Sequence, residues 1–580
     1  MSDYSTTIER RLTSMGVIVV IAALVILWRM FDIQILQHSH YIALALGQQR
    51  FEKTEIAQRG KVYVHDSSVD PKSYYPLAFD VKKFSVWVVP KNVTDKVEAS
   101  KQLSVLLGIP ELEIFNKINN DKLYIPPLKK GLVLDEANNI KNKKIAGVFV
   151  MPEYSRYYPE GTLASQVLGF VNSEGDGKYG FEGHYNNELK GMAGDVKGEK
   201  DTLGRMINLL EQNAPQDGTS YVLTVDRSLQ YYVEKKLNEA IQTFQADSGS
   251  IVIMDIETGG IIAMASAPTY DPNNFQSYAK DNQGIYVNPV IAHLYEPGSI
   301  LKPLVMSAAI DSGAIAADTT SDFDWHVFVG GFEIKTAEKK AFGHENMTQV
   351  LQNSDNVAMV WISEKMGKDN LYKYLNAYNL LDKTNIDLDT ESAGYTPPFK
   401  HWRDINRATI AFGQGISVTP IEIVSAYAAM ANKGVYIYPH IVDKIISPDG
   451  SEKKIEKQTG ERVIKPETAQ ALAEMMFNVV ENGHSWRAKV PGFKIGAKTG
   501  TAQIPKPEGG YEESEDGLGI FVHSLAGFAP TDDPKYAMLV KLDRPKTNKY
   551  AENTAAPVFG DISNYLLNYY YRLKPTRPIP

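Results

Sequence analysis

A serine and a lysine at the start of an apolar helical stretch are the first candidates for covalent chemistry in this sequence. Ser299 and Lys302 lie within Tyr295-Glu-Pro-Gly-Ser-Ile-Leu-Lys-Pro303, where proline and glycine indicate a helix start. Residues three apart on a helix share a face, so a neutral lysine amine could take the serine proton. The same spacing recurs by chance, as at Ser451 and Lys454, so the pair alone is weak evidence.

A second polar segment, Asn353-Ser354-Asp355-Asn356, precedes the apolar stretch Val357–Trp361. In a catalytic interpretation, Ser354 relays a proton and the Asn356 amide holds a substrate carbonyl. The alternative is an ordinary helix cap, for which serine, aspartate and asparagine are preferred residues. Taken alone, this segment fits both interpretations.

A third segment, Lys498-Thr499-Gly500-Thr501, is the only Lys-Thr-Gly in the chain and lies in a strand-like stretch. Lys498 would supply positive charge, and the hydroxyls of Thr499 and Thr501 would bind a carboxylate. Gly500 would let a ligand lie against an edge strand, as an added peptide strand does. The alternative is a strand weakened by glycine that carries an exposed lysine.

Together the three segments are far more specific than any one of them. In this order they form the set found in class A β-lactamases and penicillin-binding proteins. The chain resembles a class B penicillin-binding protein, a monofunctional D,D-transpeptidase. Outside the three motifs, the segments that carry the resemblance are Arg59-Gly60, Arg156–Gly161, Gly180–Gly183, Asp201–Arg205, Gly249–Asn273, Phe412–Pro420 and Gly527–Pro530.

The resemblance implies an enzyme that cross-links peptidoglycan through a covalent intermediate. Ser299 would attack the penultimate D-alanine carbonyl of a stem peptide, release the last D-alanine and remain as an acyl-enzyme. Lys302 would be the base, and burial and the nearby charge of Lys498 would both lower its pKa. Ser354 would pass the proton toward the leaving amine. An amine from a neighbouring strand would then take the acyl group.

Substrate binding is implied for the remaining motif residues. Asn356 would orient the peptide, Lys498 would help to hold its terminal carboxylate, and the backbone N–H groups of Ser299 and Thr501 would form the oxyanion hole. No metal or cofactor is expected, and a β-lactam, which mimics acyl-D-Ala-D-Ala, is expected to inhibit covalently. The other residues expected to bind substrate are Thr499, Gly500 and Thr501.

Several fates of the acyl-enzyme, and several roles in the cell, remain open. Transfer to water would make the protein a D,D-carboxypeptidase or a β-lactamase, and a penicillin sensor or a non-catalytic divisome scaffold would need no transfer. The segment Gly169–Gly183 favours the septal, FtsI-type branch over the elongation branch. A septal role implies a polytopic membrane glycosyltransferase of the FtsW type and other divisome proteins as partners.

The motifs must be positioned by elements at both ends of one region. Ser250–Asp255 and Ile261–Ala265 indicate two strands near its start, and Phe493–Gln503, Ser524–Phe528 and Tyr536–Leu542 indicate strands near its end. This order predicts one sheet whose first and last strands are neighbours, covered by helices on both faces. The resemblance implies that the sheet is antiparallel, as in the serine β-lactamase-like fold. Helices are expected at Leu301–Ala316, Thr348–Met366, Pro420–Lys433, Pro466–Val480 and Ala556–Tyr571.

The whole chain, of α+β class, is long enough for several domains. It has 580 residues, and a single core rarely exceeds about 250–300 residues. The net charge of -8 is mild and argues against nucleic acid as a partner, and the lack of cysteine excludes disulfides. The predicted domains are an extended pedestal of dimerisation type at residues 37–215, the transpeptidase domain at residues 216–573 and a Pro-rich tail at residues 574–580.

The first 36 residues predict a membrane anchor. Residues 1–11 would be cytoplasmic and residues 12–36 a transmembrane signal-anchor helix, because Leu12–Trp28 is uncharged and Arg10 and Arg11 precede it. A cleaved signal peptide is the alternative, although the small-residue cleavage site is missing. The rest of this single-pass protein would lie outside the bacterial cytoplasmic (inner) membrane.

Overall fold

The structure is a computed structural model that describes residues 2–41, 50–68, 73–200, 206–278, 283–514, 516 and 518–578. The family-like segment Asp201–Arg205 lies outside the described residues, as do residues 579 and 580 of the tail. The chain forms two compact units, which are described separately. One comprises Met1–Gln58 and Gly191–Asp217, and the other comprises Arg59–Lys190 and Gly218–Pro580.

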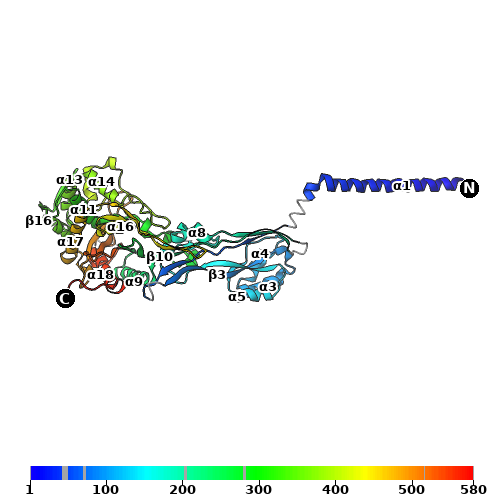
Figure 1. The fold of residues 1–580 in the computed structure, drawn as a ribbon, viewed down its shortest axis with the longest axis horizontal. Helices are drawn as coiled ribbons and strands as arrows, with labels where there is room; N and C mark the ends of the chain where they lie inside the picture. The colour runs from blue at the N-terminus through cyan, green and yellow to red at the C-terminus, as the bar shows by residue number, and fades with distance from the viewer. Residues whose placement is uncertain are drawn as a thin grey trace. The chain divides into compact units, whose positions relative to one another are not determined.

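The first unit contains a long apolar helix and a small sheet. Helix α1 (Ser2–Phe31), blue in Figure 1, continues into the π-helical turn η1 (Asp32–Leu36). Within them Ile8–Leu36 is long and apolar enough to cross a membrane, with a mean hydropathy of 2.3. The expected N-terminal apolar helix is therefore present. The sheet is antiparallel, in the order β1 (Arg50–Glu55), β8 (Gly194–Lys200) and β9 (Met206–Asn213).

A seven-stranded sheet forms the first part of the second unit. Its longest strand, β3 (Tyr74–Val88), pairs with β5 (Val148–Tyr157) along one edge. It also pairs with β2 (Val62–His65) and with β4 (Lys129–Leu132). An apolar core that includes Leu103 and Ile114 lies between this sheet and three helices. These helices are α3 (Lys96–Leu107), α4 (Glu111–Ile118) and α5 (Leu134–Asn142).

A buried ion cluster ties the short helix α7 (Gly180–His184) to this sheet. Glu182, which is fully buried, forms ion pairs with Arg59 at 2.6 Å and with Arg156 at 2.7 Å, and Arg156 also pairs with Asp80. Burial alone would raise the pKa of Glu182, but the charges of Arg156 and Arg59 outweigh it and leave that pKa lowered. Three of the family-like segments named from the sequence therefore meet here.

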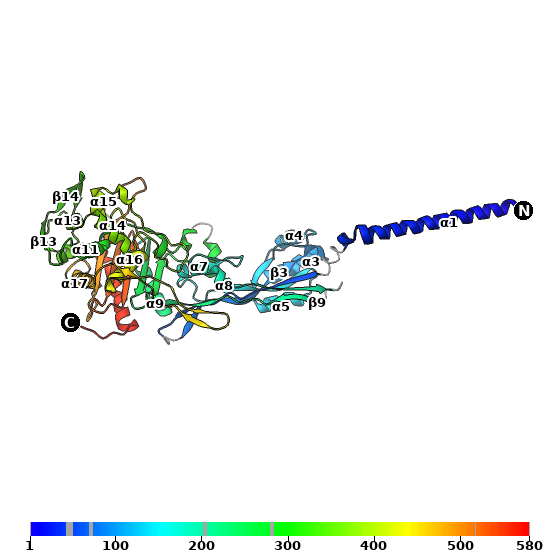
Figure 2. The same cartoon turned by 45° about the horizontal axis from the view of Figure 1, so that its top comes forward.

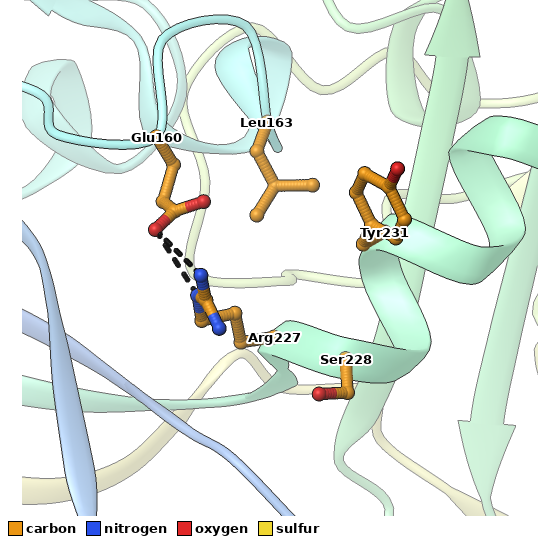
Figure 3. Close-up of a pocket in the computed structure, with 5 residues that line it drawn as sticks. All are labelled: Glu160, Leu163, Arg227, Ser228 and Tyr231. Atoms are coloured by element: carbon orange, nitrogen blue, oxygen red, sulfur yellow. Dashed lines mark hydrogen bonds and ion pairs between the residues drawn. The ribbon is translucent and has the colours of Figure 1, made fainter. Parts of the chain in front are cut away.

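Strand β10 (Ser220–Asp226) continues the same sheet across the predicted domain limit at residue 216. It pairs in parallel with β2 and antiparallel with β18 (Val442–Ile446). Next to it, Arg227 forms ion pairs with Asp66 and with Glu160, and Figure 3 shows the pair with Glu160. The domain limits stay predictions. Backbone hydrogen bonds between β10 and β2 join residues on either side of the limit at residue 216.

The region that holds the motifs has its own five-stranded antiparallel sheet, as expected. Figure 2 shows its green first strands beside its orange and red last ones. Backbone pairing of the first expected strand, Ser250–Asp255, with the last, Tyr536–Leu542, joins the two ends. The order is β12 (Ile261–Ala267), β11 (Ser248–Asp255), β23 (Tyr536–Asp543), β22 (Phe521–Ala529) and β21 (Gly496–Gln503).

Alternate residues of the central strand β23 belong to two separate apolar cores, because side chains alternate across a strand. Met538 and Val540 belong to the core with α9 (Arg227–Phe244) and α18 (Ala555–Tyr565). Leu539 belongs to the larger core with α11, α13, α16 and α17. Helices therefore cover both faces of the sheet. The helices of the larger core are α11 (Lys302–Asp311), α13 (Asn356–Met366), α16 (Pro420–Ala431) and α17 (Pro466–Asn482).

Candidate active site

The first motif forms a tight turn that leads into a buried helix. Gly298–Leu301 is a 3-10 turn, and the Lys302 backbone N–H donates to the Ser299 carbonyl as α11 begins. Side chains three apart in such a turn eclipse one another, so Ser299 and Lys302 share a face. Ser299 is half-buried and Lys302 is fully buried. Pro303 occupies the first helical turn, where its missing N–H has no helical partner to lose.

Glycines hold this turn against two neighbouring segments. The Gly298 N–H donates to the Gly413 carbonyl at 3.0 Å, and a Cβ on Gly413 would lie 2.0 Å from the Gly298 carbonyl oxygen. A Cβ on Gly500 would meet Ser524 Oγ at 2.7 Å, Ile300 Cγ2 at 3.0 Å and the carbonyl oxygen of residue 297 at 3.0 Å. The sequence interpretation assigned Gly500 to ligand approach. The structure adds a second reason for glycine here, the close contact of β21 with the serine turn; the role of Gly500 in ligand approach stays a prediction.

The second motif breaks what the sequence predicts as one helix over Thr348–Met366. Helix α12 (Met347–Asn353) ends where Ser354 adopts a left-handed conformation with φ of 55°, and α13 begins at Asn356. Non-glycine residues take this conformation mainly where the surrounding structure imposes it, and such residues cluster at functional sites. The hydrophobic pattern runs through the break because both helices pack on the same core, so the pattern could not reveal it.

Lys302 and the second motif are joined by three hydrogen bonds. Lys302 Nζ donates to the Ser354 carbonyl at 2.6 Å, to Asn356 Oδ1 at 2.7 Å and to Ser354 Oγ at 3.2 Å. The capping interpretation also holds, since Asp355 accepts from the backbone N–H groups of residues 357 and 358. Cap and site therefore use alternate residues of one segment.

The third motif lies on β21, the last strand in the order of the described sheet. Lys498 is fully buried, and its Nζ donates to Ser354 Oγ at 3.0 Å and to the Thr499 carbonyl at 3.1 Å. Thr499 is largely buried, and the Thr501 hydroxyl accepts from the Ala551 N–H at 3.2 Å. The three motifs thus converge, and the Ser354 hydroxyl receives hydrogen bonds from both lysines.

Burial dominates the electrostatics of the two lysines. It lowers the pKa of Lys498 to about 7. It also lowers the pKa of Lys302 well below its ordinary value, and the charge of Lys498 lowers it further, while Asp355 and Glu345 oppose the shift. A lysine that can be neutral near physiological pH can accept a proton, which the chemistry of the first motif requires.

Two residues near the serine turn were missed by the sequence interpretation. Glu296 is almost fully buried, accepts from the Gly415 N–H at 2.9 Å and accepts from the Tyr511 hydroxyl at 3.0 Å. Tyr511 belongs to the segment that follows β21, so this contact ties that segment to the serine turn. Glu296 stands inside the first motif, but the sequence offers no signal for partners so far along the chain.

Two hollows in the described part of the chain lie away from the motifs. One, of about 260 Å³, is lined by Glu160, Leu163, Arg227, Ser228 and Tyr231 (Figure 3). The other, of about 410 Å³, includes Asp387 and His440 in its wall. No motif residue lines either hollow. Within the described ranges, no three His, Asp or Glu side chains are grouped to hold a metal ion.

Comparisons with known proteins define the class. Residues 249–564 match the penicillin binding protein transpeptidase domain, and residues 54–223 match the penicillin-binding protein dimerisation domain. The chain belongs to the penicillin-binding protein transpeptidase family. Within that family it is a class B penicillin-binding protein, a peptidoglycan D,D-transpeptidase of the serine type.

Individual relatives cover nearly the whole chain. Stage V sporulation protein D of Bacillus subtilis is 31% identical, covering 96% of this chain and 85% of that protein. The peptidoglycan D,D-transpeptidase FtsI of Escherichia coli is also 31% identical, covering 86% and 82%. A crystal structure of penicillin binding protein 3 from Mycobacterium tuberculosis complexed with aztreonam aligns with a TM-score of 0.69 at 25% identity, covering 91% and 100%.

Proposed function

We propose that the protein cross-links peptidoglycan stem peptides through an acyl-enzyme on Ser299. The observation that carries the proposal is that Lys302 and Lys498 both donate hydrogen bonds to Ser354, and Lys302 also donates to Asn356. These contacts bring the second and third motifs to the turn that holds Ser299. Ser299 is half-buried, and its hydroxyl makes no hydrogen bond to any residue that the structure describes. This leaves the oxygen free to attack a substrate carbonyl.

The proposed acylation moves one proton through three groups. Neutral Lys302 takes the proton of Ser299 as the serine oxygen bonds to the penultimate D-alanine carbonyl carbon. Ser354, which accepts from both lysines, passes a proton to the nitrogen of the last D-alanine as the amide C–N bond breaks. An amine from a neighbouring strand then attacks the ester carbonyl carbon and loses a proton to neutral Lys302, and this proton passes to the Ser299 oxygen as the ester C–O bond breaks.

The remaining motif residues bind the substrate in this proposal. Asn356 orients the peptide, and Lys498, Thr499 and Thr501 surround its terminal carboxylate. The backbone N–H groups of Ser299 and Thr501 stabilise the oxyanion, each by roughly 10²–10³ in rate. Gly500 contributes by allowing β21 to contact the serine turn. β-Lactams would acylate the same serine, in keeping with the aztreonam complex of the similar Mycobacterium tuberculosis protein.

The proposed setting is septal wall synthesis at the cytoplasmic membrane. The FtsI relative supports this setting, and the helix within Ile8–Leu36 supports an anchor with the N-terminus inside and the catalytic region outside. A polytopic glycosyltransferase of the FtsW type and other divisome proteins would be the partners. The sporulation protein among the relatives favours a second setting, wall synthesis during spore formation.

Fluorescent penicillin labelling of the full chain in detergent tests the proposed chemistry. Ser299→Ala is expected to abolish labelling. Ser451→Ala is a matched control, since Ser451 has the same spacing to a lysine but lies exposed in a turn. Persistent labelling of the Ser299 variant would refute the assignment. Supplying an acyl donor with and without an amine acceptor then separates peptide transfer from hydrolysis.

A further inference from the structure

Two buried carboxyl groups lie next to the Ser354 turn, and neither takes part in the proposed acylation. Glu345, on strand β16 (Gly343–Asn346), is 2% exposed, and Asp355 is fully buried. Glu345 Oε1 accepts from Asn353 Nδ2 at 2.7 Å, and Asp355 Oδ1 accepts from two backbone N–H groups. The second oxygen of each carboxyl, Oε2 and Oδ2, is buried and has no donor among the residues that the structure describes.

One proton shared between Glu345 Oε2 and Asp355 Oδ2 would give both oxygens a hydrogen bond. A protonated carboxyl can donate to a neighbouring carboxylate, whereas two ionised carboxyls can only repel each other. Glu345 and Asp355 are close enough for charge and hydrogen-bond interactions between their side chains. Asp355 is the better place for the negative charge, because two backbone N–H groups at the start of α13 already donate to it.

We propose that Glu345 is a positioning residue of the active site, whose protonated carboxyl donates to Asp355 and thereby fixes the turn that presents Ser354 and Asn356 to Lys302. The inference rests on the proposed acyl-enzyme function. Asn353 and Asp355, at either side of Ser354, are then both held by Glu345. The left-handed Ser354 backbone has a support on each side.

The proposal implies a pH response of acylation. Burial, together with the charge of Asp355, raises the pKa of Glu345 to about 7, against the opposing hydrogen bond from Asn353. Above that pH the shared proton is lost and the two carboxylates repel each other. The new negative charge also raises the pKa of Lys302 and so favours the charged amine, which cannot act as a base.

The surroundings of Glu345 leave few other groups to cause this response. Lys302 faces it from α11 and Asp355 from the motif turn, and Lys498 acts through Lys302. On the neighbouring strand β13 (Thr320–Phe323), Ser321 is its cross-strand partner. Asp322 of that strand pairs with His344 in solvent.

The test is the second-order rate constant for acylation by a fluorescent penicillin, measured on the full chain across pH. Glu345→Gln keeps a donor for Asp355 and cannot ionise. It is expected to match wild type at about pH 6 and to lack the loss of rate that wild type shows as the pH rises through about 7, where the Glu345 carboxylate forms and raises the pKa of Lys302. Asp322→Asn is the matched control and is expected to follow wild type.

A second variant gives an independent readout. Asn353→Ala removes the hydrogen bond that lowers the pKa of Glu345, so the inflection of its rate profile is expected at higher pH than in wild type. A purely structural role would lower rates without moving this inflection. Profiles of both variants that superimpose on wild type would overturn the inference, while wild type labelled at Ser299 would still support the proposed function.

Discussion

At the residue scale, the two buried lysines contact the same hydroxyl but have different roles in the proposed mechanism. Lys302 and Lys498 both donate to Ser354 Oγ, and burial lowers the pKa of each. The charge of Lys498 lowers the pKa of Lys302 further, which supports Lys302 as the base of the proposed mechanism. Lys498, with a pKa lowered to about 7, carries its positive charge below that pH, and in the proposed mechanism this charge binds the substrate carboxylate.

Replacing Lys302 removes the proposed base together with its hydrogen bonds to Ser354 and Asn356. Lys302→Ala is expected to lower the acylation rate constant by about 10²–10⁴, the usual contribution of a positioned base. Stopped-flow acylation with a chromogenic β-lactam measures this change. Lys454→Ala, which alters the exposed lysine of the chance motif, is the control. A loss of less than about tenfold for the Lys302 variant would assign the base elsewhere.

At the scale of elements, the contact between β21 and the serine turn depends on a missing side chain. Gly500→Ala would place a Cβ 2.7 Å from Ser524 Oγ and 3.0 Å from the backbone at residue 297, so the strand or the turn must shift. We expect a destabilisation of about 1–3 kcal/mol and a clear loss of acylation. Gly460→Ala, whose added Cβ meets atoms only at 3.4 Å or more, is the matched control. Equal acylation by both variants would contradict this reading of the contact.

The ion cluster around α7 predicts a large effect on stability. Glu182→Ala would leave Arg59 and Arg156 buried without that partner, which costs about 3–5 kcal/mol in comparable cases. Because the pKa of Glu182 is lowered on folding, its contribution is complete above the ordinary value of 4.5 and is lost as the pH falls below that value. Thermal unfolding against pH measures both effects. Glu113, the exposed acid of the Lys117–Glu113 pair, provides the control. Glu113→Ala should change the free energy of unfolding by less than about 1 kcal/mol. Equal melting temperatures of the two variants would contradict the predicted contribution of the ion cluster to stability.

The order of strands and helices and the pairing of the first and last strands could be predicted from the sequence, but most other tertiary contacts could not. The turn signals around Thr258 predicted the β11–β12 hairpin, and the resemblance of the three motifs to a known set implied that they share one site. The helix break at Ser354 was hidden because apolar residues continue on both sides of it. The reason for Gly500 and the partners of Glu296 and Glu345 depend on segments distant in the chain. Local periodicity carries no information about such contacts.

At the scale of the whole molecule, the prediction concerns the side of the membrane on which each part lies. The chain contains no cysteine, so single cysteines can serve as probes without background. With the N-terminus inside, Ser451→Cys is expected to react with a membrane-impermeant maleimide on intact cells, and Ser5→Cys only after permeabilisation. The opposite pattern would reverse the proposed topology. Reaction of neither residue before permeabilisation would place both inside.

The identity of the acylated residue is the most direct test of the central claim. After reaction with a penicillin, the digested full chain is analysed by mass spectrometry for the peptide that carries the adduct. We predict a single adduct, on Ser299, absent from Ser299→Ala and retained in Ser451→Ala. An adduct on another residue, or none on the folded protein, would contradict the assignment of Ser299 as the nucleophile.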